Sequence, residues 1–145
     1  LNTFNELLKW KVIPVVNEND TVAVDEMDHQ TSFGDNDWLS AVVASGIDAD
    51  LLIVLSDIDG LFDKNPKKYA DANLISEVTE INEKITGAAG GTGSRFGTGG
   101  MATKIKAMDR MINEGRKAVL ANGKRPSIIF EILNGKQIGT LFHKK

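Results

Sequence analysis

The segment Gly97–Lys104 (GTGGMATK) has the residue types and the spacing of a turn that binds phosphate. Its glycines run directly into a stretch with helical periodicity. The first turn of a helix offers backbone N–H groups without intrahelical partners, and glycines let phosphate oxygens approach the backbone. The segment is not a Walker loop, because Gly-Lys-Ser/Thr is missing, nor a clean Gly-x-Gly-x-x-Gly dinucleotide fingerprint. It predicts a phosphate site of another kind.

Lys104 strengthens this interpretation through its place on the predicted helix Met101–Glu114. At 3.6 residues per turn, the inward stripe of that helix consists of Met101, Ile105, Met108 and Ile112. Lys104 falls at the edge of this stripe, where a cation in the first turn opposes the helix dipole, and a bound anion removes that objection. Lys106 and Arg110 are expected to point outward as solvated charges. The alternative is a flexible loop followed by a lysine whose stem lies along the helix.

Two polar segments with acidic residues precede this turn in the chain. Asn17–Asp20 (NEND) follows an apolar run, where an α/β protein binds its ligand, and a turn rich in side-chain-to-backbone hydrogen bonds is the alternative. Gly34–Asp37 (GDND) opens a predicted helix, and N-capping explains one or two of its three polar residues. An aspartate of this segment close to Lys104 is suited to hold the lysine in place or to help bind Mg²⁺.

A third polar segment, Ser56–Gly60 (SDIDG), follows the most apolar run of the sequence. Asp57 and Asp59 are expected at the carboxyl end of a strand, where ribose or metal contacts are made. A tight Asp-Gly turn is the alternative for Asp59. His29 and His143 have no partner at ligand spacing, and we expect both at the surface.

Alternating apolar runs and amphipathic stretches position these segments. The predicted strands are Val12–Val16, Leu51–Leu55, Lys117–Ala121 and, at an edge, Gly139–Phe142. The predicted helices are Trp38–Ser45, Glu77–Thr86, Met101–Glu114 and Ser127–Leu133, the last capped by Ser127. The first three strands should lie side by side in one parallel sheet, which predicts an α/β fold. Ligands of such sheets bind beyond the carboxyl ends of the strands.

Two loops separate these elements, at residues 56–76 and at Gly87–Gly100. The second contains seven glycines in fourteen residues. Because glycine loses the most backbone entropy on ordering, we expect this loop to be poorly ordered until a nucleotide binds.

The composition narrows the class of protein. The 145 residues carry a net charge of −3 with scattered lysines, so no basic surface for nucleic acid is expected. The lack of cysteine excludes disulfides and cysteine-ligated metals. No apolar run approaches the length of a membrane span and no signal peptide is visible, which favours a cytoplasmic protein without a membrane partner. Trp10 and Trp38 are expected in the core.

In this order, the motifs resemble the amino acid kinase family over nearly the whole chain. The matching segments are Ile13–Asp20, Phe33–Asp37, Leu55–Phe62, Gly97–Lys104 and Ile138–Phe142. The resemblance implies a three-layer α/β sandwich with a largely parallel sheet. Residues 1–145 would form the C-terminal, nucleotide-binding part of the kinase domain. The family's N-terminal lobe, with a second catalytic lysine, has no counterpart here, so we expect the chain alone to be inactive.

Within the family, Asn17–Asp20 together with Gly34–Asp37 is typical of the member that phosphorylates the side-chain carboxylate of L-glutamate, the first step of proline biosynthesis. The resemblance implies transfer from ATP, with Mg²⁺, by a cytoplasmic homo-oligomeric enzyme. One alternative is another phosphotransferase of the family, acting on aspartate, carbamate or a nucleoside monophosphate. A second alternative is a non-catalytic nucleotide-binding module.

The resemblance also implies roles for individual residues. Asp20 and Asn36 would bind glutamate, with Asp20 suited to its ammonium group. Asp37 would organise the catalytic lysines, and Lys104 would stabilise the transition state. Ser56 stands where the family usually has threonine and keeps the hydroxyl. Nucleotide contacts would come from Ser56, Asp57, Thr98, Gly99, Gly100, Met101, Ala102, Thr103 and Lys104. No residue is assigned as a protein ligand of a metal.

Overall fold

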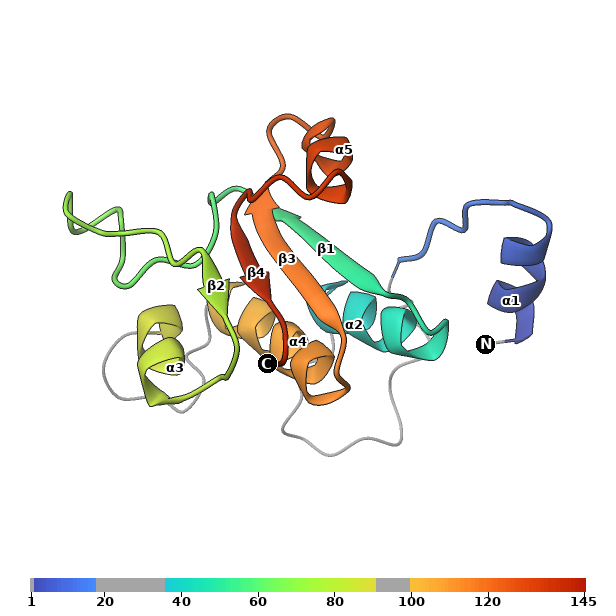
Figure 1. Cartoon of the computed structure of the whole chain (residues 1–145), viewed down its shortest axis with the longest axis horizontal. Helices are drawn as coiled ribbons and strands as arrows, with labels where there is room; N and C mark the ends of the chain where they lie inside the picture. Colours follow the sequence, from blue (N-terminus) through green and yellow to red (C-terminus); the bar gives the residue numbers. More distant parts are fainter. Residues whose placement is uncertain (1, 18–35, 91–99) are drawn as a thin grey trace.

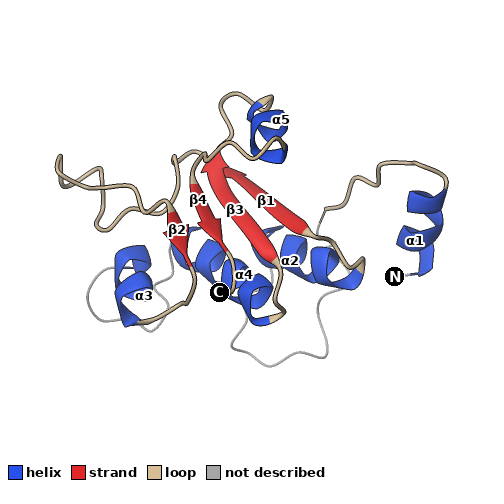
Figure 2. Cartoon of the chain, in the orientation of Figure 1, coloured by secondary structure: helices blue, strands red, loops and turns tan. Residues whose placement is uncertain are grey.

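The computed structural model describes residues 2–17, 36–90 and 100–145. The helices are α1 (Asn2–Lys9), α2 (Asn36–Gly46), α3 (Glu83–Gly90), α4 (Gly100–Asn113) and α5 (Ile128–Leu133). The strands are β1 (Leu51–Ser56), β2 (Glu77–Val78), β3 (Lys117–Asn122) and β4 (Thr140–Phe142). Figures 1 and 2 show one sheet with α2 and α4 along it, α5 near one end and α1 standing apart. No helix in the described ranges is long and apolar enough to span a membrane.

The four strands form one sheet in the order β1-β3-β4-β2. β1 and β3 are parallel and pair from Leu51 opposite Lys117 to Ser56 opposite Asn122. β4 is antiparallel to β3 and parallel to β2. The predicted α/β fold with a largely parallel sheet is confirmed, and the two central predicted strands are neighbours as expected.

The strands bury alternate side chains on opposite faces of the sheet. On one face, side chains of α2, α3 and α4 pack against Leu52, Val54, Ala118, Leu120 and Phe142. On the other face, Val119 and Ala121 pack against Ile128 and Ile132 of α5. Helices therefore lie on both faces of the sheet, in three layers.

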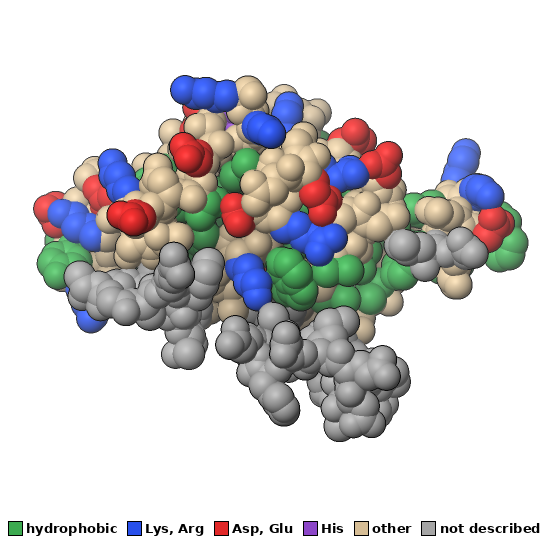
Figure 3. Space-filling view, turned by 90° about the horizontal axis from the view of Figure 1, so that it is seen from below, with side chains coloured by type: hydrophobic (Ala, Val, Ile, Leu, Met, Phe, Trp, Pro, Cys, Tyr) green, Lys and Arg blue, Asp and Glu red, His purple; other side chains and the backbone are tan. Residues whose placement is uncertain are grey.

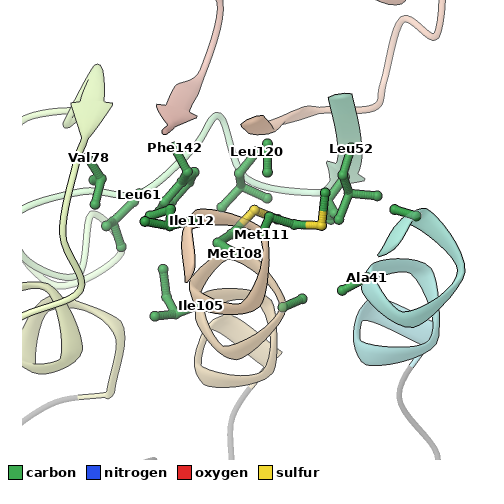
Figure 4. Close-up of a cluster of buried hydrophobic side chains, with 14 of the residues drawn as sticks. Ala41, Leu52, Leu61, Val78, Ile105, Met108, Met111, Ile112, Leu120 and Phe142 are labelled. Carbon is green, nitrogen blue, oxygen red and sulfur yellow. The ribbon is translucent and has the colours of Figure 1, made fainter. Parts of the chain in front are cut away.

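The larger of the two cores is centred on α4. Ile105, Met108 and Ile112 are at most 5% exposed, as their helical spacing predicts, and Met111 widens the buried stripe. Met101, at the start of this stripe, is half-buried. Figure 4 shows Ile105, Met108, Met111 and Ile112 of α4 together with side chains of the sheet, among them Leu52, Leu120 and Phe142. The packing fixes the rotation of α4 about its axis, and with it the direction of every polar side chain on the helix.

The predicted first strand is absent from the sheet. Residues 12–16 have no strand structure, and Ile13 and Val15 are 86% and 97% exposed. A strand needs a neighbour to pair its backbone N–H and C=O groups, and this segment has no strand beside it among the described residues. Pro14 has no N–H to donate. The apolar run alone therefore does not make a strand here, and the prediction of three adjacent parallel strands is wrong for this segment.

The predicted helix Glu77–Thr86 is also wrong in its first half. Glu77 and Val78 form β2, which pairs with β4, and the helix starts only at Glu83. Asn82 explains this start because its Oδ1 accepts hydrogen bonds from the N–H groups of Lys84 and Ile85, at 3.1 and 3.2 Å. This is N-capping by an asparagine.

The helix α3 runs on to Gly90, and Gly100 already belongs to α4. The predicted loop Gly87–Gly100 is therefore shorter than expected at both ends. Residues 91–99 lie outside the described residues, so its expected ordering by nucleotide stays a prediction.

Two further expectations near the C-terminus need correction. β4 is not an edge strand, because it lies between β3 and β2. Ser127 has helical dihedral angles and makes no capping hydrogen bond through its side chain, since a cap residue must leave the helical conformation.

Thr140 joins the sheet to the loop that follows β1. Its side chain is fully buried, accepts a hydrogen bond from the Leu61 N–H at 2.8 Å and donates one to the Ile75 carbonyl at 2.6 Å. Leu61 and Ile75 are themselves paired through the Ile75 N–H at 2.8 Å. The Thr140 hydroxyl thus holds the two ends of the loop, Leu61 and Ile75, against β4; we call these two ends the loop neck.

We expect Thr140→Val to destabilise the protein by about 1–3 kcal/mol, because valine keeps the volume but leaves a buried N–H and a partly buried C=O without their partner. Urea unfolding of the two proteins measures the change. Thr86→Val is the control, since the half-buried Thr86 hydroxyl lies on α3 and bonds the carbonyls of Asn82 and Glu83 at the start of the same helix. Equal stability of Thr140→Val and the parent protein would contradict this account of the loop neck.

A second contact, between His143 and Glu77, joins β4 and β2 with 2.5 Å between Nε2 and Oε1. The hydrogen bond to the Glu77 carboxylate, and then that to the Lys144 carbonyl, raise the pKa of His143 above its ordinary value of 6.5. A raised folded-state pKa stabilises the fold at pH values below the unfolded pKa, and this stabilisation is lost as the pH rises through the folded pKa.

Glu77→Gln removes the charged partner of His143. We therefore expect its loss of stability, relative to the parent protein, to be larger at about pH 6 than at about pH 9. Thermal unfolding at the two pH values tests this. An equal loss of stability at the two pH values would show that protonation of His143 is not coupled to folding.

Candidate active site

A pocket of about 360 Å³ opens where β1 ends and α4 begins. Its lining residues are Ser56, Asp57, Ile58, Pro66, Lys67, Gly100, Met101 and Lys104. The volume lies within the range of small-molecule sites in proteins. The pocket also lies where parallel α/β sheets bind ligands, beyond the carboxyl end of a strand. Figure 3 shows basic and acidic side chains interspersed over the face seen from below, without one large basic surface.

Hydrogen bonds between neighbouring strand ends form the sheet side of the pocket. The Gly123 N–H donates to the Ser56 carbonyl at 2.8 Å, and Asn122 Nδ2 donates to Asp59 Oδ1 at 2.7 Å. Ser56 Oγ donates to Asp57 Oδ1 at 3.2 Å. These contacts hold the two loops beyond β1 and β3 together. The Asp59 carboxylate is engaged in this link rather than in the pocket lining.

Gly60 lets the chain turn sharply behind the pocket. Its φ is +155°, and an added Cβ would lie 2.7 Å from Thr140 Oγ1. The glycine is thus needed for the close approach of the loop to β4, beside the buried Thr140 hydroxyl. This favours the tight-turn interpretation of Asp59-Gly60 over a ligand-binding one.

The helix side of the pocket contains an ion pair between α2 and α4. Lys104 Nζ lies 2.8 Å from Asp37 Oδ2, and the two side chains are only 17% and 16% exposed. Thr103 Oγ1 lies 3.2 Å from the same carboxylate oxygen and 3.0 Å from the Gly100 carbonyl. Lys104 is the fifth residue of α4, near the positive end of the helix dipole, and the nearby carboxylate offsets the cost of placing a cation there.

The contact between α2 and α4 positions this ion pair. Ala41 of α2 and Ala107 of α4 are fully buried, so the two helices can approach closely. The half-buried Trp38 ring lies under two cations, with Lys106 Nζ 5.0 Å and Arg110 Cζ 5.3 Å from its centroid. The expectation that both cations are simply solvated is therefore wrong, because each covers an aromatic face that would otherwise meet water.

The structure brings together five of the residues predicted to contact nucleotide. These are Ser56, Asp57, Gly100, Met101 and Lys104, which all line the pocket. Of the others, Ala102 is buried, while Thr103 contacts Asp37. Asn36 is exposed at the start of α2 and does not line the pocket. Three of the predicted site residues lie outside the described residues: Asp20, Thr98 and Gly99.

Sequence reasoning assigned no role to three further residues that line the pocket, Ile58, Pro66 and Lys67. Pro66 and Lys67 come from a polar loop, and only the contacts that fold this loop back reveal its position. No group of three or more His, Cys, Asp or Glu side chains suited to a metal occurs within residues 2–17, 36–90 and 100–145. A metal there would need ligands from a bound substrate as well.

Comparison with known proteins gives close relatives. The sequence profile of the amino acid kinase family matches residues 1–122. The chain is 99% identical over all its 145 residues to a glutamate 5-kinase of Ligilactobacillus salivarius strain UCC118, of which it covers 54%. It is 60% identical over 143 residues, or 99% of its length, to a glutamate 5-kinase of Enterococcus faecalis strain ATCC 700802 / V583, of which it covers 53%. The chain thus spans about half the length of the curated relatives it matches.

Solved structures of lower sequence identity have the same fold. An isopentenyl phosphate kinase of T. acidophilum, in a product complex, is 26% identical, with a TM-score of 0.54 over 74% of this chain and 38% of that one. A carbamate kinase of Giardia lamblia bound to AMP-PNP is 21% identical, with a TM-score of 0.57 over 77% of this chain and 36% of that one, a likeness of fold alone. The predicted resemblance is confirmed by the profile match over residues 1–122, and the chain belongs to the amino acid kinase family.

Proposed function

We propose that the full-length protein is a glutamate 5-kinase, which transfers the γ-phosphoryl group of ATP to the side-chain carboxylate of glutamate. The observation that carries the proposal is the Asp37–Lys104 ion pair beside a pocket at the start of α4. The names of the two relatives from Ligilactobacillus salivarius and Enterococcus faecalis described above support the choice of acceptor. The proposed product, glutamyl 5-phosphate, would begin proline biosynthesis in the cytoplasm, and we expect a homo-oligomer.

The proposed reaction needs no general base, because a carboxylate is already ionised at neutral pH. One bond forms between a glutamate carboxylate oxygen and the γ-phosphorus, and the bond from that phosphorus to the β–γ bridging oxygen breaks, releasing ADP. The obstacle is the approach of two anions. Catalysis then depends on positioning and on fixed positive charge.

Lys104 is the fixed cation in this proposal. It lines the pocket while Asp37 holds its ammonium group, so its place does not have to change as the phosphoryl group moves. The unpaired N–H groups of the first turn of α4, from Gly100 onward, add positive potential at the same end of the pocket. Ser56 and Asp57 lie across the pocket, at the end of β1, and are suited to contact the nucleotide.

The remaining proposed roles concern glutamate and Mg²⁺. We assign glutamate binding to Asp20 and Asn36, as the family resemblance implies. Among the described residues that line the pocket, Asp57 is the one carboxylate. A single carboxylate fits Mg²⁺ that enters with the nucleotide and is held mainly by phosphate oxygens. The ion would supply charge neutralisation on the phosphates. The residues described above perform the positioning.

The proposal is tested by incubating the full-length protein with ATP and a carboxylate acceptor, and trapping the acyl phosphate with hydroxylamine. We expect hydroxamate with glutamate and little with aspartate. Turnover with aspartate or carbamate, and not with glutamate, would assign the chain to a different reaction of the same family.

Comparing Lys104 with a second lysine of the same helix separates the effect of its position from the effect of losing one positive charge. We expect Lys104→Ala to lower kcat about a hundredfold to a thousandfold, with a smaller change in the KM for glutamate, because charge on the transferred oxygens grows toward the transition state. Lys106→Ala is the matched control on the same helix: its ammonium lies over Trp38 and does not line the pocket. Steady-state kinetics that show similar losses in both variants would rule out a special role for Lys104.

Asp37 should act through Lys104 and not independently. Asp37→Asn keeps the shape but removes the charge, so we expect kcat to fall about tenfold or more while ATP still binds. In a double-mutant cycle, adding Asp37→Asn to Lys104→Ala should cost little further activity. Fully additive losses would mean that the two side chains contribute separately and that their ion pair is incidental.

A further inference from the structure

An amide at the end of β3 binds a carboxylate beside the pocket. Asn122, the last residue of β3, pairs with Ser56, the last residue of β1, and its Nδ2 donates a hydrogen bond to Asp59 Oδ1 at 2.7 Å. Figure 1 shows the two strands side by side and ending at the same edge of the sheet. Asp59 does not line the pocket, although Asp57 and Ile58 directly before it do. Neither Asp59 nor Asn122 has a role in the function proposed above.

The position of Asp59 makes its charge unfavourable for the proposed ligand. Its Cα follows that of the pocket residue Ile58 at about 3.8 Å, well within the distance of about 8 Å over which charges interact at physiological ionic strength. A carboxylate that turned toward the phosphate chain of a nucleotide would repel it. Among the described residues, no cation forms a salt bridge with Asp59. The direction of the Asp59 side chain therefore matters for anion binding.

Asn122 is held in a position that sets this direction. The residue is half-buried, and its Oδ1 accepts a hydrogen bond from the Lys124 N–H at 2.9 Å, which fixes the orientation of the amide. The Gly123 N–H donates to the Ser56 carbonyl at 2.8 Å and keeps the two strand ends together. Asn122 itself does not line the pocket. Its hydrogen bond thus draws the Asp59 carboxylate toward β3 and away from the pocket lining.

The backbone that follows Asp59 is fixed independently of Asn122. Gly60 is buried so close to β4 that an added Cβ would lie 2.7 Å from Thr140 Oγ1. The N–H of Leu61 donates to the same oxygen at 2.8 Å. Because these contacts hold the turn, loss of the Asn122 amide should release the Asp59 side chain and leave the path of the loop unchanged.

We propose that Asn122 is a positioning residue of the nucleotide site, which binds the Asp59 carboxylate and keeps its negative charge away from the phosphate chain of ATP. This inference rests on the proposed function, because it assigns a further residue to the same nucleotide site. It concerns ATP binding and not the acceptor. It also gives Asp59 a role opposite to that of a ligand contact, since removal of its charge, with the hydrogen bond kept, favours the nucleotide.

Isothermal titration calorimetry on the full-length protein, with ATP and adenosine as ligands and with and without Mg²⁺, tests the proposal. We expect Asn122→Ala to weaken ATP binding about three- to fivefold, since an exposed charge interaction is modest in strength. Adenosine carries no phosphate, so its affinity should not change. Asp59→Asn keeps an acceptor oxygen for Asn122 and should bind ATP at least as tightly as the parent protein. Adding Asp59→Asn to Asn122→Ala should restore most of the lost affinity.

A second asparagine bound to an aspartate provides a matched control. Asn73 Nδ2 donates to Asp63 Oδ2 at 3.2 Å in the loop that follows β1, and neither residue lines the pocket. Asn73→Ala keeps the Asn73 N–H, which donates to Asp63 Oδ1 at 2.9 Å, so the two sides of this loop stay joined. This variant should bind ATP and adenosine as the parent protein does. Equal losses of ATP affinity in Asn73→Ala and Asn122→Ala would overturn the proposal.

Three further results would overturn it for different reasons. Weaker ATP binding in Asp59→Asn, with or without Mg²⁺, would show that the carboxylate contacts the nucleotide or its metal ion. A parallel loss of ATP and adenosine binding in Asn122→Ala would show a general change of the pocket. A double variant as weak as Asn122→Ala alone would show that the released charge is not the cause. The titration needs no glutamate, so a protein with the expected ATP affinities that does not phosphorylate glutamate would refute only the proposed function.

Discussion

A cation that lies near the start of a helix and is about five-sixths buried is unfavourable by itself, and Asp37 is the group that compensates Lys104. The compensation comes from a second helix, so it exists only while α2 and α4 remain in register. Asp37 is in the first turn of α2 and Lys104 is the fifth residue of α4, so their ion pair brings two helix starts together beside the pocket. The electrostatics of the site thus depend on one helix–helix contact.

The rest of the fold keeps that contact in place. Ala41 and Ala107 allow the helices to approach, and the buried face of α4 against the sheet fixes the direction in which Lys104 points. The parallel pairing of β1 with β3 places Ser56 and Asp57 at the opposite side of the pocket. In the proposed function, the phosphate site is therefore formed by the carboxyl end of β1, the start of α4 and a lysine whose charge is already paired.

The sequence predicts the parts of this arrangement that have local signals. The period of α4 places Ile105, Met108 and Ile112 in the core and Lys104 at their edge, and the apolar runs of β1 and β3 identify two parallel neighbours. The short strand β2 is different, since it is defined by its pairing with β4, far along the chain, and the strand β4 is predicted without its place inside the sheet. The sequence also does not predict that the loop carrying Lys67 reaches the pocket. The buried Thr140 hydroxyl, far along the chain, holds both ends of this loop against β4.

The most direct test is a structure of the full-length protein with a non-hydrolysable ATP analogue and glutamate. The account predicts the phosphate chain between the end of β1 and the start of α4, with Lys104 Nζ within about 3 Å of a phosphate oxygen and still paired with Asp37. A nucleotide bound elsewhere would contradict it. A Lys104 side chain that contacts Asp37 alone, with its ammonium turned away from the phosphates, would contradict it equally.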